Sequence, residues 1–496
     1  MALLRGTEAG ELGSHRRRLF GTPPPGGVRA QDAAPFGWAP LVILVAVGIV
    51  DAMESRIIGG ALPIIIDEFG ISDAAAGAIP TAVTIAGAIV TLPAGYLADR
   101  YNRTNLMALV VLSWAFLLVG TALAATFALF FAMRVVLGAA DSIDNPASGS
   151  LLGDYYPPLT RAKAFGWARL TTYAGGALGT VFGAVVADLL GWRWAYALMV
   201  VPGLVCAWAC WRLREPVRGF MDQIVAQGSS EPVPAPPSPD DAHVRARDKL
   251  REVGRATARA PAPVTDEAAA AREQLKAQLD FREQLKGVFR VRTLRLVTFG
   301  LMAMAFGLGG IVYWVPTLMH RNFGIEVAAA GSVAGLISVA GLIGGTMYGG
   351  RLGRLWHGTR NGGRLLAGGG GLLIGSLLLG ASLAQPSLGT FALVLLVATA
   401  FMALAIPNLM ASVADVLLAT SRGIGFSILQ FLVAGAGAWS PLIVGVISDA
   451  TGSLVTGMYA LVLPGAMSGV LVLMARRTFD DDAGRVLDAA RGSAEQ

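Results

Sequence analysis

Long apolar stretches alternate with short polar gaps along most of the chain, and this pattern predicts membrane-spanning helices. About 20 apolar residues wound as a helix cross the roughly 30 Å hydrocarbon core of a bilayer. Only helices and closed barrels satisfy every backbone group in lipid, and these stretches are too long and too evenly apolar for barrel strands. Twelve spans are predicted, at about 38–66, 75–98, 104–125, 127–153, 162–187, 192–211, 293–320, 328–350, 363–384, 388–418, 423–449 and 453–475.

The polar gaps predict the orientation of these spans, because basic residues gather on the cytoplasmic side of a membrane. One set of gaps holds nearly all the arginines and lysines, whereas the opposite set holds little beyond Arg193 and Arg321. We therefore expect a multi-pass protein of the plasma or inner membrane with both termini in the cytoplasm. Its predicted parts are a cytoplasmic tail (1–37), a six-helix bundle (38–211), a cytoplasmic linker (212–291), a second six-helix bundle (292–476) and a cytoplasmic tail (477–496).

The linker divides into two parts by composition. Residues Glu231 to Asp241 are rich in proline and should be extended. From Thr265 the sequence predicts a helix, because Thr265 can cap it and two acidic residues follow in its first turn. We expect this helix to lie on the membrane surface.

Composition agrees with a membrane protein and argues against other classes. The chain has 496 residues, 54% of them hydrophobic and only 15% charged, whereas a soluble protein carries about 25% charged residues. The net charge of +6 could suggest a nucleic-acid partner, but the basic residues lie in the gaps between spans, so we expect none. The chain has no HExxH motif, phosphate-binding loop or usable Ser/His/Asp arrangement, so we expect no enzyme activity, no cofactor and no metal site.

The two halves of the chain are repeats of each other. Pro146, Asp154, Arg161 and Phe165 recur as Pro407, Asp415, Arg422 and Phe426, always 261 positions later. This repeat predicts an all-α membrane protein with twelve transmembrane helices in two six-helix bundles, related by an axis along the membrane normal. Substrate would bind near the midplane and be reached alternately from each side. Two repeats without a large external domain fit a receptor poorly.

Charged residues inside the spans are the strongest candidates for function, because each costs at least about 2.5–3.5 kcal/mol on insertion scales. Span one carries Asp51, Glu54 and Arg56, and span four carries Arg134 and Asp141 on one helix face. A count of helical rise puts Glu54 near the depth of Arg134. We expect Asp51, Glu54, Arg134 and Asp141 to form an interior cluster that couples transport to protons, with Asp141 as the switch. A permanent salt bridge that fixes helix register is the alternative, and sodium coupling stays open.

Other residues in the spans are candidates for binding substrate. Asp144 and Arg169 could contact a polar headgroup, or they could pair statically. The second half offers an apolar wall, and such a wall opposite charged residues suits an amphiphile with one polar end. Plain helix packing is the alternative for the members of this wall, which are Phe306, Tyr313, Trp314, Met402, Asn408, Gln430 and Phe431.

The gap after the second span reads Gly95-Tyr-Leu-Ala-Asp99-Arg100-Tyr-Asn-Arg103. Glycine allows close helix packing, and charges at helix ends can pair with each other and with helix dipoles. We expect a latch that holds one conformation, and simple anchoring by positive charge is the alternative. The predicted members of the latch are Gly95, Asp99, Arg100, Arg103, Asp154, Arg161, Asp415 and Arg422.

This gap resembles the loop signature of the major facilitator superfamily, Gly-x-Leu-x-Asp-Arg-x-x-Arg, and Arg134 to Gly138 resembles the span-four pattern of that superfamily. Within it, the chain is most similar to the spinster family of lysolipid and sphingolipid transporters, over about residues 38–476. The residues that carry this similarity are Met53 to Arg56 with Ala61-Leu62-Pro63, Tyr101-Asn102-Arg103, Asp141-Ser142, Gly309-Gly310 with Trp314-Val315-Pro316, and Ser440-Pro441.

Several positions depart from that family's pattern. Its span-four glutamate falls on Asp141, its span-one aspartate falls on Glu54, and an acid expected in span eleven is missing near Gly437. The second copy of the loop signature, Gly350 to Arg354, has no aspartate. These departures bear on the identity of the substrate more than on the mechanism.

The resemblance implies a proton-coupled secondary transporter that moves a lysophospholipid or similar single-chain amphiphile by alternating access. A polyspecific drug or organic-ion exporter of the same superfamily is the alternative. The expected partners are an amphiphilic small molecule or lipid, protons and the lipid bilayer, and we expect the protein to act as a monomer.

Overall fold

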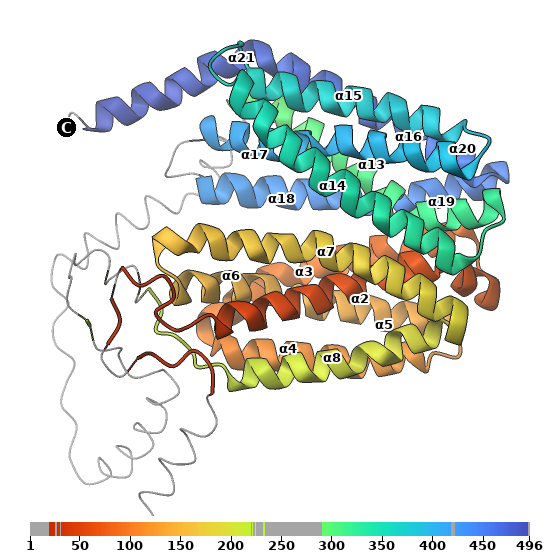
Figure 1. Cartoon of the computed structure of the whole chain (residues 1–496), viewed down its shortest axis with the longest axis horizontal. Helices are drawn as coiled ribbons and strands as arrows, with labels where there is room; N and C mark the ends of the chain where they lie inside the picture. Colours follow the sequence, from red (N-terminus) through yellow and green to blue (C-terminus); the bar gives the residue numbers. More distant parts are fainter. Residues whose placement is uncertain are drawn as a thin grey trace, which may run out of the picture. The chain divides into compact units, whose positions relative to one another are not determined.

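Figure 1 shows the computed structural model of the chain, which is built from α-helices. It describes residues 19–24, 27–29, 31–219, 221, 224, 232–233, 290–417 and 422–494, without the side chains at 92–100, 145–146, 158–159, 162, 169–170, 422–424, 427 and 487–494. Within these ranges the only strand-like pairings are two isolated bridges, Phe20 with Leu213 and Val28 with Val233. The predicted linker helix from Thr265 lies outside the described residues.

The helices follow the predicted spans to within a few residues at most ends, and the all-α expectation is confirmed for the described residues. The last helix is the main exception, because it continues well past the predicted end of its span. The helices are α2 (Ala39–Phe69), α3 (Asp73–Arg100), α4 (Arg103–Ala122), α5 (Phe127–Asp141), α6 (Asp144–Tyr155), α7 (Pro158–Leu190), α8 (Trp192–Arg212), α13 (Arg292–Phe323), α14 (Val327–Trp356), α15 (Gly363–Leu383), α16 (Leu388–Ala403), α17 (Ala405–Asp415), α18 (Arg422–Ala438), α19 (Ser440–Thr451), α20 (Leu454–Tyr459) and α21 (Val462–Ala494).

Ten helical segments in the described part of the chain are long and apolar enough to cross a membrane. The two predicted spans that fall short are the ones that carry the charged candidates. Helix α2 is 31 residues long but holds Asp51, Glu54 and Arg56 close together. Span four is divided into α5 and α6, of 15 and 12 residues, which are each too short. The count of twelve spans therefore stays a prediction.

Four predicted spans are broken near a proline. Helices α6, α17, α19 and α21 each begin two or three residues after the last residue of the preceding helix, and each has a proline in its first turn: Pro146, Pro407, Pro441 and Pro464. Proline has no N–H to donate to the preceding turn, and its ring clashes with the carbonyl four residues earlier, so it favours the first turn of a helix and kinks or breaks an interior. Helices α2, α8 and α13 nevertheless continue through Pro63, Pro202 and Pro316. The two breaks at Pro146 and Pro407 are 261 positions apart, so the internal repeat includes them.

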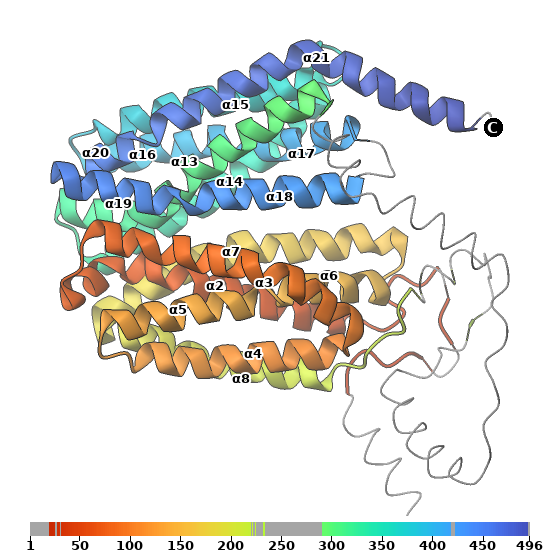
Figure 2. The same ribbon diagram turned by 180° about the vertical axis from the view of Figure 1, so that it is seen from behind.

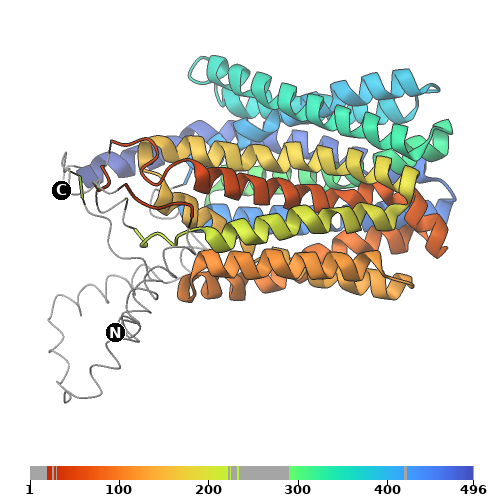
Figure 3. The same cartoon turned by 60° about the horizontal axis from the view of Figure 1, so that its bottom comes forward.

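The helices pack into two units, which we describe separately. The first, unit 1, comprises Met1–Ile71, Ala82–Ala256 and Glu326–Gly335. Its most extensive helix pairs are α2 with α7 and α4 with α8, and Figure 3 shows α2 between α7 and α8. Glycines bring α2 and α7 together: a methyl group at Gly179 would lie 2.1 Å from the Met53 carbonyl oxygen, and one at Gly183 would lie 2.5 Å from that of Ile57. Small residues allow this approach in membrane helices.

The second, unit 2, comprises Ser72–Thr81, Thr257–Ile325 and Leu336–Gln496. Helix α21 packs against both α13 and α15, as Figure 2 shows. Its continuation past the predicted span has a structural role, because Asp482 accepts a hydrogen bond from the Thr293 N–H (3.0 Å) at the start of α13. An acid at a helix N-terminus satisfies free N–H groups and the helix dipole. Unit 2 also takes in the first turns of α3, so its limits differ from the predicted bundles, whose boundaries stay a prediction.

Candidate functional site

The charged candidates of span one and span four meet in the interior of unit 1. The Arg134 guanidinium, from α5, donates to the Glu54 carboxylate, from α2. The residues are buried, with 3% and 5% of their surface exposed. The ring of Tyr196 covers the guanidinium at 5.3 Å, and Tyr196 packs on the ring of Phe130. The predicted partnership of Glu54 and Arg134 is therefore present, and it is shielded by aromatic rings.

The remaining two members of the predicted cluster lie beside this pair. Asp51 of α2 and Asp141, the last residue of α5, are within hydrogen-bonding reach of each other, and Glu54 is close enough to act on both charges. A hydrogen bond between two carboxyl groups needs a proton on one of them, because an ionised carboxylate has no donor. The structure thus brings Asp51, Glu54, Arg134 and Asp141 together, as the sequence predicts. Their role in coupling transport to protons stays a prediction.

Asp144 lies across the break from Asp141, at the first position of α6. It is 6% exposed, and its Oδ1 has no hydrogen-bond partner among the described residues. An acid is favourable at a helix N-terminus because of the helix dipole, but a buried carboxylate oxygen without a partner is costly. Asp51 is near enough for its charge to act on Asp144. The break between α5 and α6 therefore places two acids, Asp141 and Asp144, at facing helix ends.

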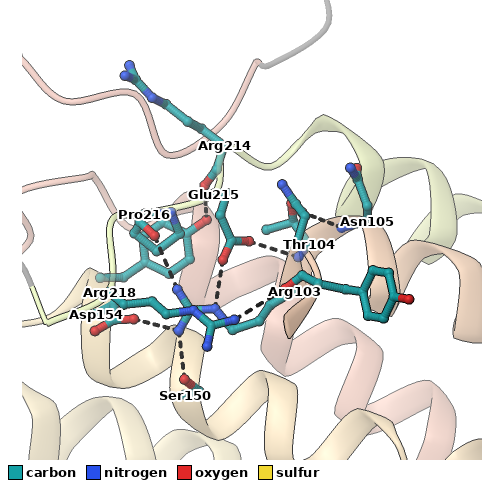
Figure 4. A network of polar contacts seen from close by, with 12 residues as sticks. Arg103, Thr104, Asn105, Ser150, Asp154, Arg214, Glu215, Pro216 and Arg218 are labelled. Carbon is teal, nitrogen blue, oxygen red and sulfur yellow. Dashed lines mark hydrogen bonds and ion pairs between the residues drawn. The ribbon is translucent and has the colours of Figure 1, made fainter. Parts of the chain in front are cut away.

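A second polar network surrounds Arg103 at the start of α4, and Figure 4 shows it from close by. The guanidinium is fully buried and donates to Asp154 Oδ2 (2.5 Å), Glu215 Oε1 (2.7 Å) and Ser150 Oγ (2.6 Å). Each acid also accepts a backbone N–H, with Asp154 bound to Gly219 (2.9 Å) and Glu215 bound to Thr104 (3.0 Å). These bonds tie α4 and α6 to the segment that follows α8. Arg103 and Asp154 were predicted from the sequence as members of the latch, whereas Glu215 was not.

Unit 2 holds the repeat of this pair. Arg364, near the start of α15, donates to Asp415 at the end of α17, and both side chains are partly exposed. Arg364 lies 261 positions after Arg103, as Asp415 does after Asp154. Asp415 was predicted from the sequence but Arg364 was not, although the repeat offset of 261 applied to Arg103 leads directly to Arg364.

Arg161, also a predicted latch residue, lies in the first turn of α7. It donates to the carbonyl oxygens of Gly153 (2.7 Å) and Tyr156 (3.3 Å) at the end of α6. A cation at a helix C-terminus satisfies free carbonyls and the helix dipole. The side chains of Asp99, Arg100, Arg169 and Arg422, and the surroundings of Gly95, lie outside the described residues.

The substrate candidates of the second half fall into two groups. Four are buried, and three of these are hydrogen-bonded to backbone carbonyls: Tyr313 to Ala76 (2.7 Å), Trp314 to Pro441 (3.0 Å) and Asn408 to Gly349 (2.9 Å), while Met402 is packed in the core. These contacts agree with the packing role left open above. Phe306 is partly buried, whereas Gln430 and Phe431 are exposed on α18.

A third network, in unit 2, was not predicted from the sequence. Asp73 at the start of α3 accepts hydrogen bonds from Arg321 (2.9 Å) and Ser448 (2.6 Å). Asp449 in turn accepts the N–H groups of Asp73 and Ala74, both at 2.9 Å. Asp449 therefore caps α3 from a different helix, α19. Nothing in the sequence indicated the partner of Asp449, which lies 376 positions away.

Comparison with known proteins gives a consistent relationship. The family model of the Major Facilitator Superfamily matches residues 44–441. Protein spinster of Drosophila melanogaster is 25% identical over 457 residues, covering 88% of this chain and 66% of that protein. Protein spinster homolog 1 of Homo sapiens is 30% identical over 189 residues, which are 37% of this chain and 35% of that protein. Puromycin resistance protein pur8 of Streptomyces alboniger is 28% identical over 182 residues, 36% of each chain.

These matches span 66% or less of the length of the curated relatives. Solved structures show the same fold more completely. The crystal structure of a bacterial homolog of the human lysosomal transporter spinster, inward-facing and unoccupied, has a TM-score of 0.71 at 20% identity, over 89% of this chain and 97% of that chain. The crystal structure of a D-xylose-proton symporter has a TM-score of 0.62 at 15% identity, over 88% and 97%.

Proposed function

The chain belongs to the Major Facilitator Superfamily and is a spinster-like transporter within it, and from this premise we propose that it moves a lysophospholipid or similar single-chain amphiphile across the membrane, coupled to protons. The observation that carries this proposal is the cluster of Asp51, Glu54, Arg134 and Asp141, in which Glu54 and Arg134 are buried and the two aspartates are partly buried. A group of ionisable residues inside membrane helices is expensive and marks substrate or proton pathways.

The proposed coupling depends on the sharing of Arg134 between two acids. In the structure Arg134 is bound to Glu54, while Asp141 is in reach of Asp51, and we propose that these two carboxyl groups share one proton in this state. If Arg134 moved toward Asp141, its positive charge would favour the ionised form of Asp141 and release that proton. Alternating access moves helices past each other around a central site, so it can supply such a movement. Binding and release of a proton would then follow the conformational cycle.

The proposed orientation places both termini in the cytoplasm, with the basic gaps on that side. Helix α8 supports a position across the membrane. Its exposed tryptophans lie near its two ends, with Trp194 at one and Trp208 and Trp211 at the other. Trp194 and Trp211 are separated by about 26 Å of helical rise, close to the hydrocarbon thickness, and tryptophan favours the two interfaces.

The Arg103 network is proposed to act as the predicted latch. It lies at the end of unit 1 where the basic residues gather, and it joins α4 and α6 to the segment that leads into the linker. A guanidinium with three side-chain partners and no exposed surface holds those elements in one arrangement. Release of these bonds would let the inner end of the unit change shape during transport.

The choice of an amphiphile as substrate is supported by the likeness to spinster proteins and by the mixture of residues. Within unit 1, Asp144 supplies a buried carboxyl group whose Oδ1 has no hydrogen-bond partner among the described residues. Unit 2, taken by itself, offers apolar surface at the partly buried Phe306 and the exposed Phe431. The similarity to a puromycin resistance protein favours the second candidate, an exporter of drugs or organic ions. The two candidates differ in whether the substrate carries a long acyl chain.

The test uses purified protein in detergent and in liposomes. A ligand that binds only the folded state raises the melting temperature. At a ligand concentration one hundred times the dissociation constant, the free energy of unfolding rises by about 2.7 kcal/mol. We expect stabilisation by lysophospholipids, and uptake of the same lipids that increases when a proton gradient is imposed. Stabilisation by hydrophilic solutes with no response to any amphiphile would contradict the proposal, and a response to cationic drugs alone would favour the exporter.

A further inference from the structure

One buried hydroxyl group beside the Glu54–Arg134 pair is left without a hydrogen bond. Tyr196, in the second turn of α8, has no exposed surface. Its hydroxyl oxygen has no hydrogen-bond partner among the described residues. A buried tyrosine hydroxyl usually has a partner, because a polar group that is desolvated without one destabilises the fold. Each such exception in a native structure requires an explanation, and packing of the ring alone does not supply one.

Aromatic neighbours hold the Tyr196 ring in place. The rings of Phe130 and Trp192 pack edge-on against it, with centroid distances of 6.1 Å and 6.2 Å. Trp192 is itself anchored, because its indole N–H donates to Glu68 Oε2 (2.6 Å). Contacts between aromatic rings at these distances are favourable without any hydrogen bond. The ring therefore has a fixed position, and this position sets where the hydroxyl group lies in the interior of unit 1.

The hydroxyl lies close to both members of the charged pair. The guanidinium carbon of Arg134 is 5.3 Å from the centroid of the Tyr196 ring, and the charges of both Arg134 and Glu54 act on the hydroxyl group. A tyrosine hydroxyl can donate to a carboxylate, which only accepts, so Tyr196 is a suitable second donor for Glu54. In the second half of the chain the corresponding positions are Leu395 and Gly457, so the arginine and the tyrosine are absent there together.

The proposed coupling step leaves Glu54 in need of a donor. When Arg134 moves toward Asp141, Glu54 remains buried, and a buried acid that loses its partner is strongly destabilising. The two states are complementary. In the described part of the chain the Tyr196 hydroxyl lacks a partner while Arg134 is bound to Glu54, and Glu54 lacks its partner once Arg134 has left. A donor that is already in place lowers the free energy of the second state without adding a charge.

We propose that Tyr196 becomes the partner of Glu54 when Arg134 leaves it: the tyrosine hydroxyl donates a hydrogen bond to the Glu54 carboxylate in the state in which Arg134 binds Asp141. Tyr196 is then a positioning residue of the coupling step, because it sets how readily Arg134 is released. The hydroxyl replaces only part of what the guanidinium supplies, since it brings no positive charge. This inference rests on the proposed function and adds a residue to its mechanism.

The experiment is a double-mutant cycle on the full-length protein in detergent, with chemical unfolding as the measurement. It is run at pH 8, which favours the ionised form of Glu54. Tyr196→Phe removes only the hydroxyl and keeps the ring contacts. Arg134→Leu removes the guanidinium and reproduces the switched state at Glu54, and Arg134→Met, which fills more of the volume of arginine, is a second variant with the same purpose. Tyr348→Phe is the matched control, because Tyr348 is an exposed tyrosine of α14.

With Arg134 present, Tyr196→Phe should leave the equilibrium constant of unfolding unchanged or lower it, because the hydroxyl has no described partner to lose. In the Arg134→Leu background the same substitution should raise that constant roughly ten- to a hundredfold, the effect of losing a hydrogen bond to a charged group. In Glu54→Leu/Arg134→Leu this effect should disappear, because the acceptor is absent. Gradient-driven uptake into liposomes should fall roughly tenfold in Tyr196→Phe, because the switched state is less populated, and Tyr348→Phe should behave as wild type.

Two failures can be told apart. If Tyr196→Phe has equal effects with and without Arg134, or an effect that persists once Glu54 is removed, the hydroxyl does not bind Glu54 and the inference is wrong. Normal gradient-driven uptake in Tyr196→Phe would also overturn it, because the contact would then play no part in the coupling step. If the cycle shows the contact but uptake by wild type ignores the proton gradient, Tyr196 remains the second partner of Glu54 and the proposed proton coupling is wrong.

Discussion

The two halves of the molecule contain the same broken helix with different side chains. In the first half α5 starts after the capping residue Thr126 and ends at Asp141, and in the second half α16 starts after the capping residue Ser387 and ends at Ala403. The caps are 261 positions apart, as are the starts of α6 and α17. Both breaks have a proline in the following turn, so the break belongs to the architecture that the halves share.

The side chains at the break do not follow the repeat. Arg134, Asp141 and Asp144 of the first half correspond to Leu395, Met402 and Ala405 of the second half, which are all buried and apolar. The fold therefore tolerates an apolar break at this place and does not require charge. Charges that the architecture can do without, at a site where they are costly, are best explained by function. The position of the helix break is therefore shared by both halves, whereas the charged side chains at the break are found only in the first half.

The largest effect is expected when Arg134 is replaced by the residue of the other half. Arg134→Leu leaves Glu54 buried without a partner, and breaking a buried pair in this way costs about 3–5 kcal/mol. The double variant Glu54→Leu/Arg134→Leu should recover most of that stability, because it removes both charges, and it should remain inactive in transport. Thermal unfolding in detergent measures the first effect, and liposome uptake measures the second.

Arg193→Leu serves as the control for this experiment. Arg193 is paired with Glu68, but the two side chains are 39% and 40% exposed, and such exposed pairs contribute about 0–1 kcal/mol. If the double variant Glu54→Leu/Arg134→Leu unfolds as readily as Arg134→Leu, the Glu54–Arg134 pair is needed for folding. The charges at this break would then not require a functional explanation.

A smaller effect is expected when the two repeated arginine–aspartate pairs, Arg103–Asp154 and Arg364–Asp415, are compared for their contribution to the free energy of unfolding. Arg103→Gln should destabilise the protein by about 3 kcal/mol, the lower end for a buried pair, since Asp154 keeps some access to water. Arg364→Gln should cost about 1 kcal/mol or less, because Arg364 and Asp415 are 22% and 35% exposed. Unfolding midpoints of the two single variants measure the difference. Equal effects would mean that Glu215, which has no counterpart in unit 2, adds nothing to the first network.

The smallest effect, and one of opposite sign, is expected at Asp144. Asp144→Ala introduces the residue found at position 405 and removes a buried carboxyl group whose Oδ1 has no hydrogen-bond partner among the described residues. The free energy of unfolding should stay the same or rise by about 1–2 kcal/mol, while transport should fall. Chemical unfolding and uptake are compared on the same preparation. A clear loss of stability with normal transport would make Asp144 a structural residue.

The helices and the charged cluster could be predicted from the sequence because both depend on local patterns. Apolar stretches of sufficient length have no other stable form in lipid, and Glu54 and Arg134 can be matched by counting helical rise from the ends of their spans. The breaks could also have been predicted. Pro146 and Pro407 lie inside predicted spans at equivalent positions of the repeat, and a proline that recurs in this way favours a break in the helix that contains it.

Contacts between distant segments could not be predicted in the same way. Glu215 lies in a segment that looks like the start of a linker, and only the fold brings it to Arg103, 112 positions away. The capping of α3 by Asp449 could not be predicted either, because the sequence does not distinguish an acid that caps another helix from any other acid at the end of a span. The sequence places Arg56 inside span one, but only the positions of the neighbouring side chains show that no ion pair joins it to another described residue.

The central claim, that the charged break of the first half couples transport to protons, is tested most directly by the pH dependence of transport in Asp141→Asn. Substrate uptake into liposomes is measured with and without an imposed proton gradient, and Asp188→Asn, at an exposed aspartate of α7, is the control. If Asp141 carries the coupled proton, Asp141→Asn still exchanges substrate but no longer responds to the gradient, while Asp188→Asn responds as wild type does. An undiminished response in Asp141→Asn would contradict this claim.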